Sequence, residues 1–130
     1  MKQKEQMDYW IKSAEDDIPV MEHLLSSGDY LWSLFIGHLI LEKMLKALVI
    51  RSSGQDAPFI HNLLHLARQT GLSLTPVQEN LLIEMMRFHI EARYPTYKEQ
   101  MRKIATKKFT AYKVKQIKEM TQWLKKQVIS

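Results

Sequence analysis

The stretch from Phe35 to Leu48 constrains this chain more than any other part of its sequence. It is rich in strong helix formers, and wound at 3.6 residues per turn it is apolar on nearly every side. A helix with so little polar surface is typical of the buried centre of a bundle. We therefore expect a long central helix, opening at Asp29-Tyr30 with Asp29 as its N-cap, running to about Ser53 and enclosed by other helices.

One polar line interrupts this apolar helix. His38, Glu42 and Lys46 follow one another at four-residue spacing, which stacks their side chains on one face. A buried charged group without a partner costs several kcal/mol, so we predict that Glu42 is buried and paired with Lys46, Arg93 or a histidine. Two kinds of interpretation remain open. The three residues could be general acid/base groups or a phosphate-binding site with Lys46 as the cation and Glu42 tuning it, or they could form a polar network that fixes helix register or a dimer interface.

The sequence before and after this helix predicts the others. A first helix is expected over residues 5–25, with Pro19 kinking it or splitting it in two. A short helix should start at His61 and end at Thr70, with Gly71 closing it. The run Thr75-Pro76-Val77-Gln78 has the residues of a capping box and should open a helix that ends near His89.

The C-terminal part should contain one more long helix. Residues 107–129 carry an apolar stripe at helical spacing, made of Val114, Ile117, Met120, Leu124 and Val128. Pro95 disfavours helical geometry at Tyr94, so the segment up to Thr106 is expected to be a loop with one helical turn. The predicted fold is all-α: an up-and-down bundle of four long helices plus one short helix, forming a single domain over residues 1–130.

Composition excludes several classes of protein. The chain has no cysteine, which excludes a disulfide framework and a thiolate zinc site. No apolar run approaches the roughly 20 residues needed to span a bilayer, and the first residues lack the apolar segment of a signal peptide. We therefore predict a cytoplasmic protein that does not contact a membrane, and the sequence gives no reason to expect a cofactor.

Positive charge is concentrated at the C-terminal end. Residues 98–130 hold ten Lys or Arg against Glu99 and Glu119, a net charge of +8 in a chain whose total is +5. Such a segment is typical of a protein that binds RNA or an acidic partner, and equally of a helix with a solvated face. RNA binding through the helix at 107–129 is therefore one interpretation, and a solvated helix face is the other.

Three stretches together resemble a known family. The pattern Phe35-x-x-His38-x-x-x-Glu42-Lys43-x-Leu45-Lys46-Ala47-Leu48 is similar to the second helix of HEPN domains. The stretches Pro58-Phe59-Ile60-His61-Asn62-Leu63-Leu64-His65-Leu66 and Glu91-Ala92-Arg93-Tyr94-Pro95 resemble the same family, in its Arg-Tyr-Pro-bearing prokaryotic type. HEPN domains are small α-helical proteins named for a proposed nucleotide-binding role, and they are similar to the helical domain of kanamycin nucleotidyltransferases.

The resemblance implies a function that the residues alone do not. It favours a non-catalytic module that binds a nucleotide or a partner protein, as the companion of a minimal nucleotidyltransferase in a toxin–antitoxin-like pair. It also implies a homodimer. The residues expected to bind the nucleotide or partner are His38, Glu42, Lys46, Arg93 and Tyr94.

The family also contains ribonucleases, whose motif is an Arg followed by four to six residues and then a His. No Arg of this chain has a His in that window; after Arg87, His89 comes only two residues later. The alternative hypothesis is therefore a ribonuclease toxin that uses Arg93 with His38 or His89 despite the missing motif.

Two further interpretations concern Arg93 and the histidines. Arg93 precedes the rigid Tyr94-Pro95 step, so its guanidinium could point inward to Glu42 or a ligand phosphate, or could bind carbonyls at the end of the preceding helix. A metal site built from His61, His65 and His89 is disfavoured: His61 and His65 are one helical turn apart, but nothing like the motif His-Glu-x-x-His is present.

Overall fold

The structure, a computed structural model, describes residues 2–129, and every regular element in that range is a helix. The six helices are α1 (Gln3–Ser26), α2 (Tyr30–Ser53), α3 (Leu63–Thr70), α4 (Pro76–Glu91), α5 (Pro95–Ile104) and α6 (Lys107–Ile129). The all-α prediction is confirmed. None of these helices is long and apolar enough to cross a membrane.

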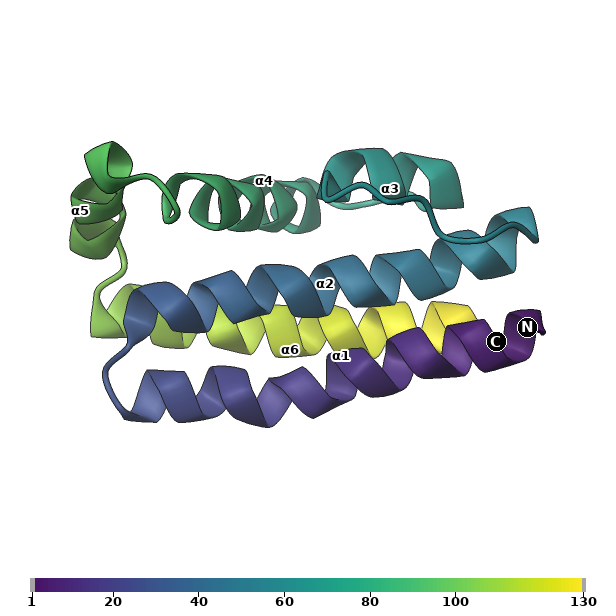
Figure 1. Ribbon diagram of the computed structural model, residues 1–130, viewed down its shortest axis with the longest axis horizontal. Helices are drawn as coiled ribbons and strands as arrows, with labels where there is room; N and C mark the ends of the chain where they lie inside the picture. The colour runs from purple at the N-terminus through teal and green to yellow at the C-terminus, as the bar shows by residue number, and fades with distance from the viewer. Residues whose placement is uncertain (1, 130) are drawn as a thin grey trace.

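The central helix of the bundle is α2. It packs against α1, α6, α3 and α4, and α1 is its most extensive neighbour. Figure 1 shows α1, α2 and α6 running side by side, while α4 and α3 lie end to end along the other side of α2. The short α5 crosses one end of the bundle and connects α4 to α6. Both described ends of the chain lie at the opposite end.

The predicted helix signals mostly hold. Thr75 and Gln78 form the complete capping box of α4, and the αL conformation of Gly71 closes α3. The stripe on α6 is buried in full, as predicted: Val114, Ile117, Met120, Leu124 and Val128. Asp29 occupies the N-cap position of α2, but its side chain makes no capping hydrogen bond there.

Two boundaries differ from the prediction, and of the two outcomes predicted for Pro19 the split is excluded. Helix α1 continues through Pro19 and does not split, and α4 runs two residues beyond His89. Helix α3 begins at Leu63, because the Asn62 side chain accepts the hydrogen bond from the His65 N–H and so acts as the N-cap. His61 is therefore not the first residue of α3 but lies before it.

The largest difference is α5, which replaces the expected loop. Pro95 does force Tyr94 out of helical geometry, with φ −108° and ψ 122°. Proline is nevertheless favoured as the first residue of a helix, because its missing N–H needs no partner there. The new helix buries Met101, so the bundle has two short helices beside its four long ones.

Candidate functional site

The polar line of α2 is buried on one face of the helix. His38 is fully buried, and Glu42 and Lys46 are each 5% exposed. The Lys46 Nζ lies 3.1 Å from the Glu42 Oε2 and 5.2 Å from the centre of the Trp10 ring of α1. Lys46 is thus enclosed by the protein, and its charge compensates Glu42. The predicted burial and pairing of Glu42 are confirmed.

A histidine completes the pairing of Glu42, as the prediction allowed, although the sequence did not specify which one. His61 comes from the segment between α2 and α3, and its Nδ1 lies 3.0 Å from the Glu42 Oε1 and 3.1 Å from the Oε2. The carbonyl oxygen of His61 accepts a hydrogen bond from the Nε2 of His38, at 3.1 Å. Both the side chain and the backbone of His61 are therefore held by α2.

The geometry of this pair sets the tautomer of His61. A carboxylate only accepts hydrogen bonds, so the Nδ1 of His61 must carry the proton and its Nε2 is left available. The His61 side chain is 66% exposed, whereas that of Glu42 is 7% exposed. A buried carboxylate thus orients an imidazole at the protein surface.

His38 and His89 form a stacked pair beside this site. Their ring centres are 3.9 Å apart with an angle of 10° between the planes, and the ring of Phe35 also stacks on His89, at 4.9 Å. Burial is the largest cause that lowers the pKa of His38 to about 3, and the nearby His89 is the second. Burial and then the charge of Arg93 lower the pKa of His89 as well.

These values decide the state of His38. At neutral pH it is uncharged, so its Nδ1, 3.7 Å from the Glu42 Oε1, forms no ion pair with that carboxylate. The Nε2 carries the proton because it donates to the carbonyl of His61. Within residues 2–129 the Nδ1 of His38 has no hydrogen-bond partner.

Arg93 lies at the end of α4, next to the histidine pair. Its Nε donates to the carbonyl oxygen of His89 at 3.1 Å, so the carbonyl-binding interpretation is confirmed. The residue is otherwise exposed, and its charge contributes to lowering the pKa of both His38 and His89. Tyr94 is 53% exposed and supplies the N-cap position of α5 with its backbone.

The structure therefore brings His38, Glu42, Lys46 and Arg93 together with His61 and His89. We call these six residues the polar cluster. Sequence reasoning missed His61 as a member, because its partner Glu42 lies 19 positions earlier and no local spacing connects them. Within the described part of the chain, no group of three or more His, Asp or Glu is placed to hold a metal ion.

The basic helix α6 is partly neutralised by other helices. Lys113 pairs with Glu84 at 2.6 Å, Lys118 with Glu22 at 2.9 Å and Lys125 with Glu15 at 2.7 Å. Four exposed lysines of α6 have no ion pair within residues 2–129: Lys107, Lys108, Lys115 and Lys126. Three of the seven lysines of α6 are thus engaged inside the bundle, and both the solvated face and RNA binding remain predictions for the other four.

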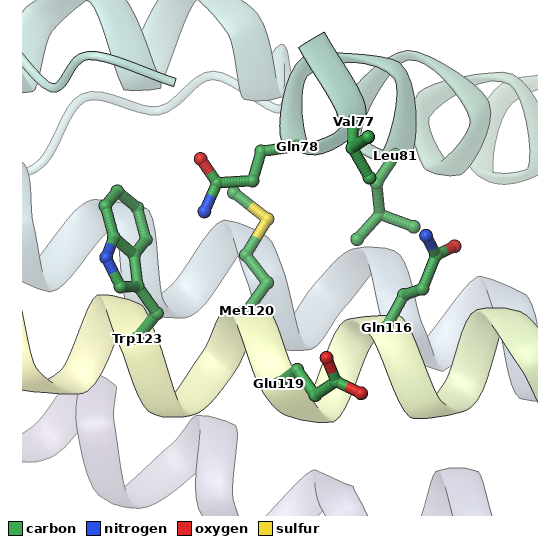
Figure 2. Close-up of a pocket in the computed structure, with 7 residues that line it drawn as sticks. All are labelled: Val77, Gln78, Leu81, Gln116, Glu119, Met120 and Trp123. Atoms are coloured by element: carbon green, nitrogen blue, oxygen red, sulfur yellow. The ribbon is translucent and has the colours of Figure 1, made fainter. Parts of the chain in front are cut away.

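A cavity of about 270 Å³ lies apart from the polar cluster, between the start of α4 and α6. Figure 2 shows Gln78 and Leu81 reaching down from α4 toward Met120 and Trp123 of α6. No member of the polar cluster lines this cavity.

The family of the chain follows from its comparison with known families. The model of the HEPN domain matches residues 7–127. The chain therefore belongs to the HEPN family, in agreement with the α-helical bundle and the three sequence stretches. No curated protein and no solved structure matches it.

Proposed function

We propose that the protein is a non-catalytic module that binds the phosphate group of a nucleotide at the surface above Glu42. The observation that carries the proposal is the Glu42–His61 contact, in which a buried carboxylate holds an exposed imidazole at 3.0 Å. His61 and Arg93 would be the ligand-binding groups: the Arg93 guanidinium donates to phosphate oxygens directly, and His61 donates from its Nε2 when that nitrogen also carries a proton. Both act electrostatically on the His38–His89 pair, so both lie close to it.

The charges of the cluster favour an anion. Lys46 neutralises Glu42 inside the protein at 3.1 Å, which leaves the exposed guanidinium of Arg93 as the dominant charge at the surface. A guanidinium offers several donors in a planar arrangement that fits phosphate oxygens. The buried Glu42, Lys46 and His38 then hold the ligand-binding side chains in place, and Tyr94 lies at the edge of the site.

Two features argue for binding without cleavage. General acid–base catalysis needs an accessible group whose pKa lies near the working pH. His38 is fully buried with a pKa of about 3, and His89 is 6% exposed with a lowered pKa. Neither histidine of the stacked pair meets that requirement, and the family's Arg–His ribonuclease spacing is absent from the sequence.

We also propose a protein partner. Membership of the HEPN family and the Arg93-Tyr94-Pro95 stretch support a companion role to a minimal nucleotidyltransferase in a toxin–antitoxin-like pair. For the homodimer, the outer face of α4 offers two exposed apolar residues two turns apart, Ile83 at 45% and Ile90 at 50% exposure. Residues seven positions apart lie on the same face of a helix, so a second copy of the chain could cover both.

A ribonuclease is the second candidate, because one observation favours it. The hydrogen bond to Glu42 leaves the Nε2 of His61 as an exposed proton acceptor near Arg93. A base and a cation at one site are two of the groups that RNA cleavage by the 2′-hydroxyl needs. Cleavage would then involve Arg93 with His61 in place of the buried His38 or His89.

Calorimetric titration with AMP tests the favoured function. We expect saturable binding to the wild type, and at least tenfold weaker binding to Arg93→Ala and to His61→Ala. The matched controls are Arg68→Ala and His65→Ala on α3, which remove an exposed residue of the same type elsewhere. Binding that survives both site variants would overturn the proposal.

Incubation with RNA separates the two candidates. We expect no cleavage by the wild type above the level of a buffer control. Metal-independent cleavage that disappears in both Arg93→Ala and His61→Ala, and persists in the two control variants, would instead establish the ribonuclease.

A further inference from the structure

Phe59 has the most exposed side chain among the large hydrophobic residues of the described chain, at 100%. It lies in the segment between α2 and α3, where its neighbours Pro58 and Ile60 are partly buried. Ile60 packs against the core, so Phe59 and His61 on either side of it are both directed outward. The fold itself gains no burial from the Phe59 ring.

The segment that presents Phe59 is anchored at both ends. Gln3 donates to the carbonyl of Gly54 at 2.8 Å, and Gln6 donates to the Asp56 side chain at 2.9 Å. At the other end, the carbonyl of His61 is bound by His38, and Asn62 caps α3. Phe59 is thus held close to the polar cluster before any ligand arrives, which lowers the entropy cost of using it for binding.

We infer that Phe59 is the base-stacking residue of the site: its ring stacks on the purine base of a nucleotide whose phosphate is bound by His61 and Arg93. The inference rests on the phosphate site proposed above and names the ligand more closely, as a purine nucleotide. One residue, Ile60, separates Phe59 from His61, so their Cα atoms lie at most about 7 Å apart. One ribose is the natural link across such a span.

Stacking on a base explains both why the Phe59 ring is exposed and why a purine should bind more tightly than a pyrimidine. An aromatic side chain gains binding energy from a base without reading its hydrogen-bonding edge, because every base has a π-face. A purine covers more of the ring than a pyrimidine and buries more apolar area. Loss of the ring should therefore weaken purine nucleotides by about 5- to 150-fold.

The experiment compares three ligands on one set of variants. Calorimetry with AMP, CMP and ribose 5-phosphate separates the base from the phosphate. Phe59→Ala removes the ring, Phe59→Leu keeps an apolar side chain without a π-face, and Phe59→Trp restores a larger ring. Tyr112→Ala on α6 is the matched control, since it removes an aromatic ring that is 58% exposed elsewhere.

We expect Phe59→Ala and Phe59→Leu to lose AMP affinity, Phe59→Trp to keep it, and ribose 5-phosphate to bind all variants equally. Equal AMP affinity of Phe59→Ala and the wild type would overturn the inference while leaving the phosphate site intact. Equal losses in Phe59→Leu for all three ligands would also overturn it, by showing that the segment and not the ring matters. Failure of both AMP and ribose 5-phosphate to bind the wild type would remove the phosphate site and the inference together.

Discussion

The two sides of α2 are buried by different kinds of contact. On the side of α1 and α6 the contact is mainly apolar and close: a Cβ atom on Gly37 would lie 2.5 Å from the Ile117 Cδ1. On the side of α4 and the segment before α3, the helix buries His38 and Glu42, while Lys46, one turn further along, pairs with Glu42 and lies over the Trp10 ring of α1. Apolar contact is non-directional and adds up over area, whereas each buried polar atom needs its own partner. The first side therefore supplies stability, and the second can orient a reactive group.

The largest effect should come from the polar side. Glu42→Gln removes the charge that compensates the buried Lys46, so we expect a loss of about 3–5 kcal/mol in the free energy of unfolding. Urea denaturation measures it, with the exposed Glu99→Gln as the matched control. The double variant Glu42→Leu with Lys46→Leu should be less destabilised than the single variant. A single-variant loss below about 1 kcal/mol would mean that water reaches the pair.

The apolar side is tested by Leu124→Ala on α6. Leu124 is fully buried, and its truncation should cost about 2–5 kcal/mol through lost burial and a cavity. The control is the exposed Lys126→Ala, which should stay within about 0.5 kcal/mol. Lys125 is a poorer control because it pairs with Glu15. Equal midpoints for the Leu124 and Lys126 variants in the same urea series would refute the apolar-side account.

The sequence predicted the apolar side better than the polar side. The α6 stripe and the α4 capping box depend on spacings of a few residues, which can be read directly. The partners of Glu42 depend on which residues the segment after α2 brings back against that helix. No local spacing predicts this, so His61 was not identified as a partner from the sequence. The helix α5 was missed because Pro95 both excludes helical geometry at Tyr94 and favours a helix that begins at its own position, and the prediction used only the first effect.

A smaller effect, the pH dependence of the free energy of unfolding, also comes from the polar side of α2. Burial lowers the pKa of His38 from 6.5 to about 3. Between these values the unfolded chain binds a proton that the folded chain excludes, so the free energy of unfolding falls as the pH falls below 6.5. For one histidine the slope approaches about 1.4 kcal/mol per pH unit, and His89 adds in the same direction.

Urea denaturation between pH 4.5 and 7 measures this slope. His38→Gln replaces the titratable ring by a neutral amide, so its free energy of unfolding should change less steeply with pH than that of the wild type. An unchanged slope in that variant, or a wild type more stable at pH 5 than at pH 7, would exclude His38 as a buried neutral group.

The most direct test of the central claim, that α2 holds an exposed phosphate-binding histidine from beneath, is an NMR titration of the wild type with inorganic phosphate. Imidazole and guanidinium nitrogens are followed in ¹⁵N-labelled protein. The account predicts that free His61 is protonated on Nδ1, and that phosphate shifts the His61 and Arg93 signals along one saturation curve, with His65 and Arg68 unchanged. A free His61 protonated on Nε2 but not on Nδ1, or phosphate shifts as large at His65 as at His61, would contradict it.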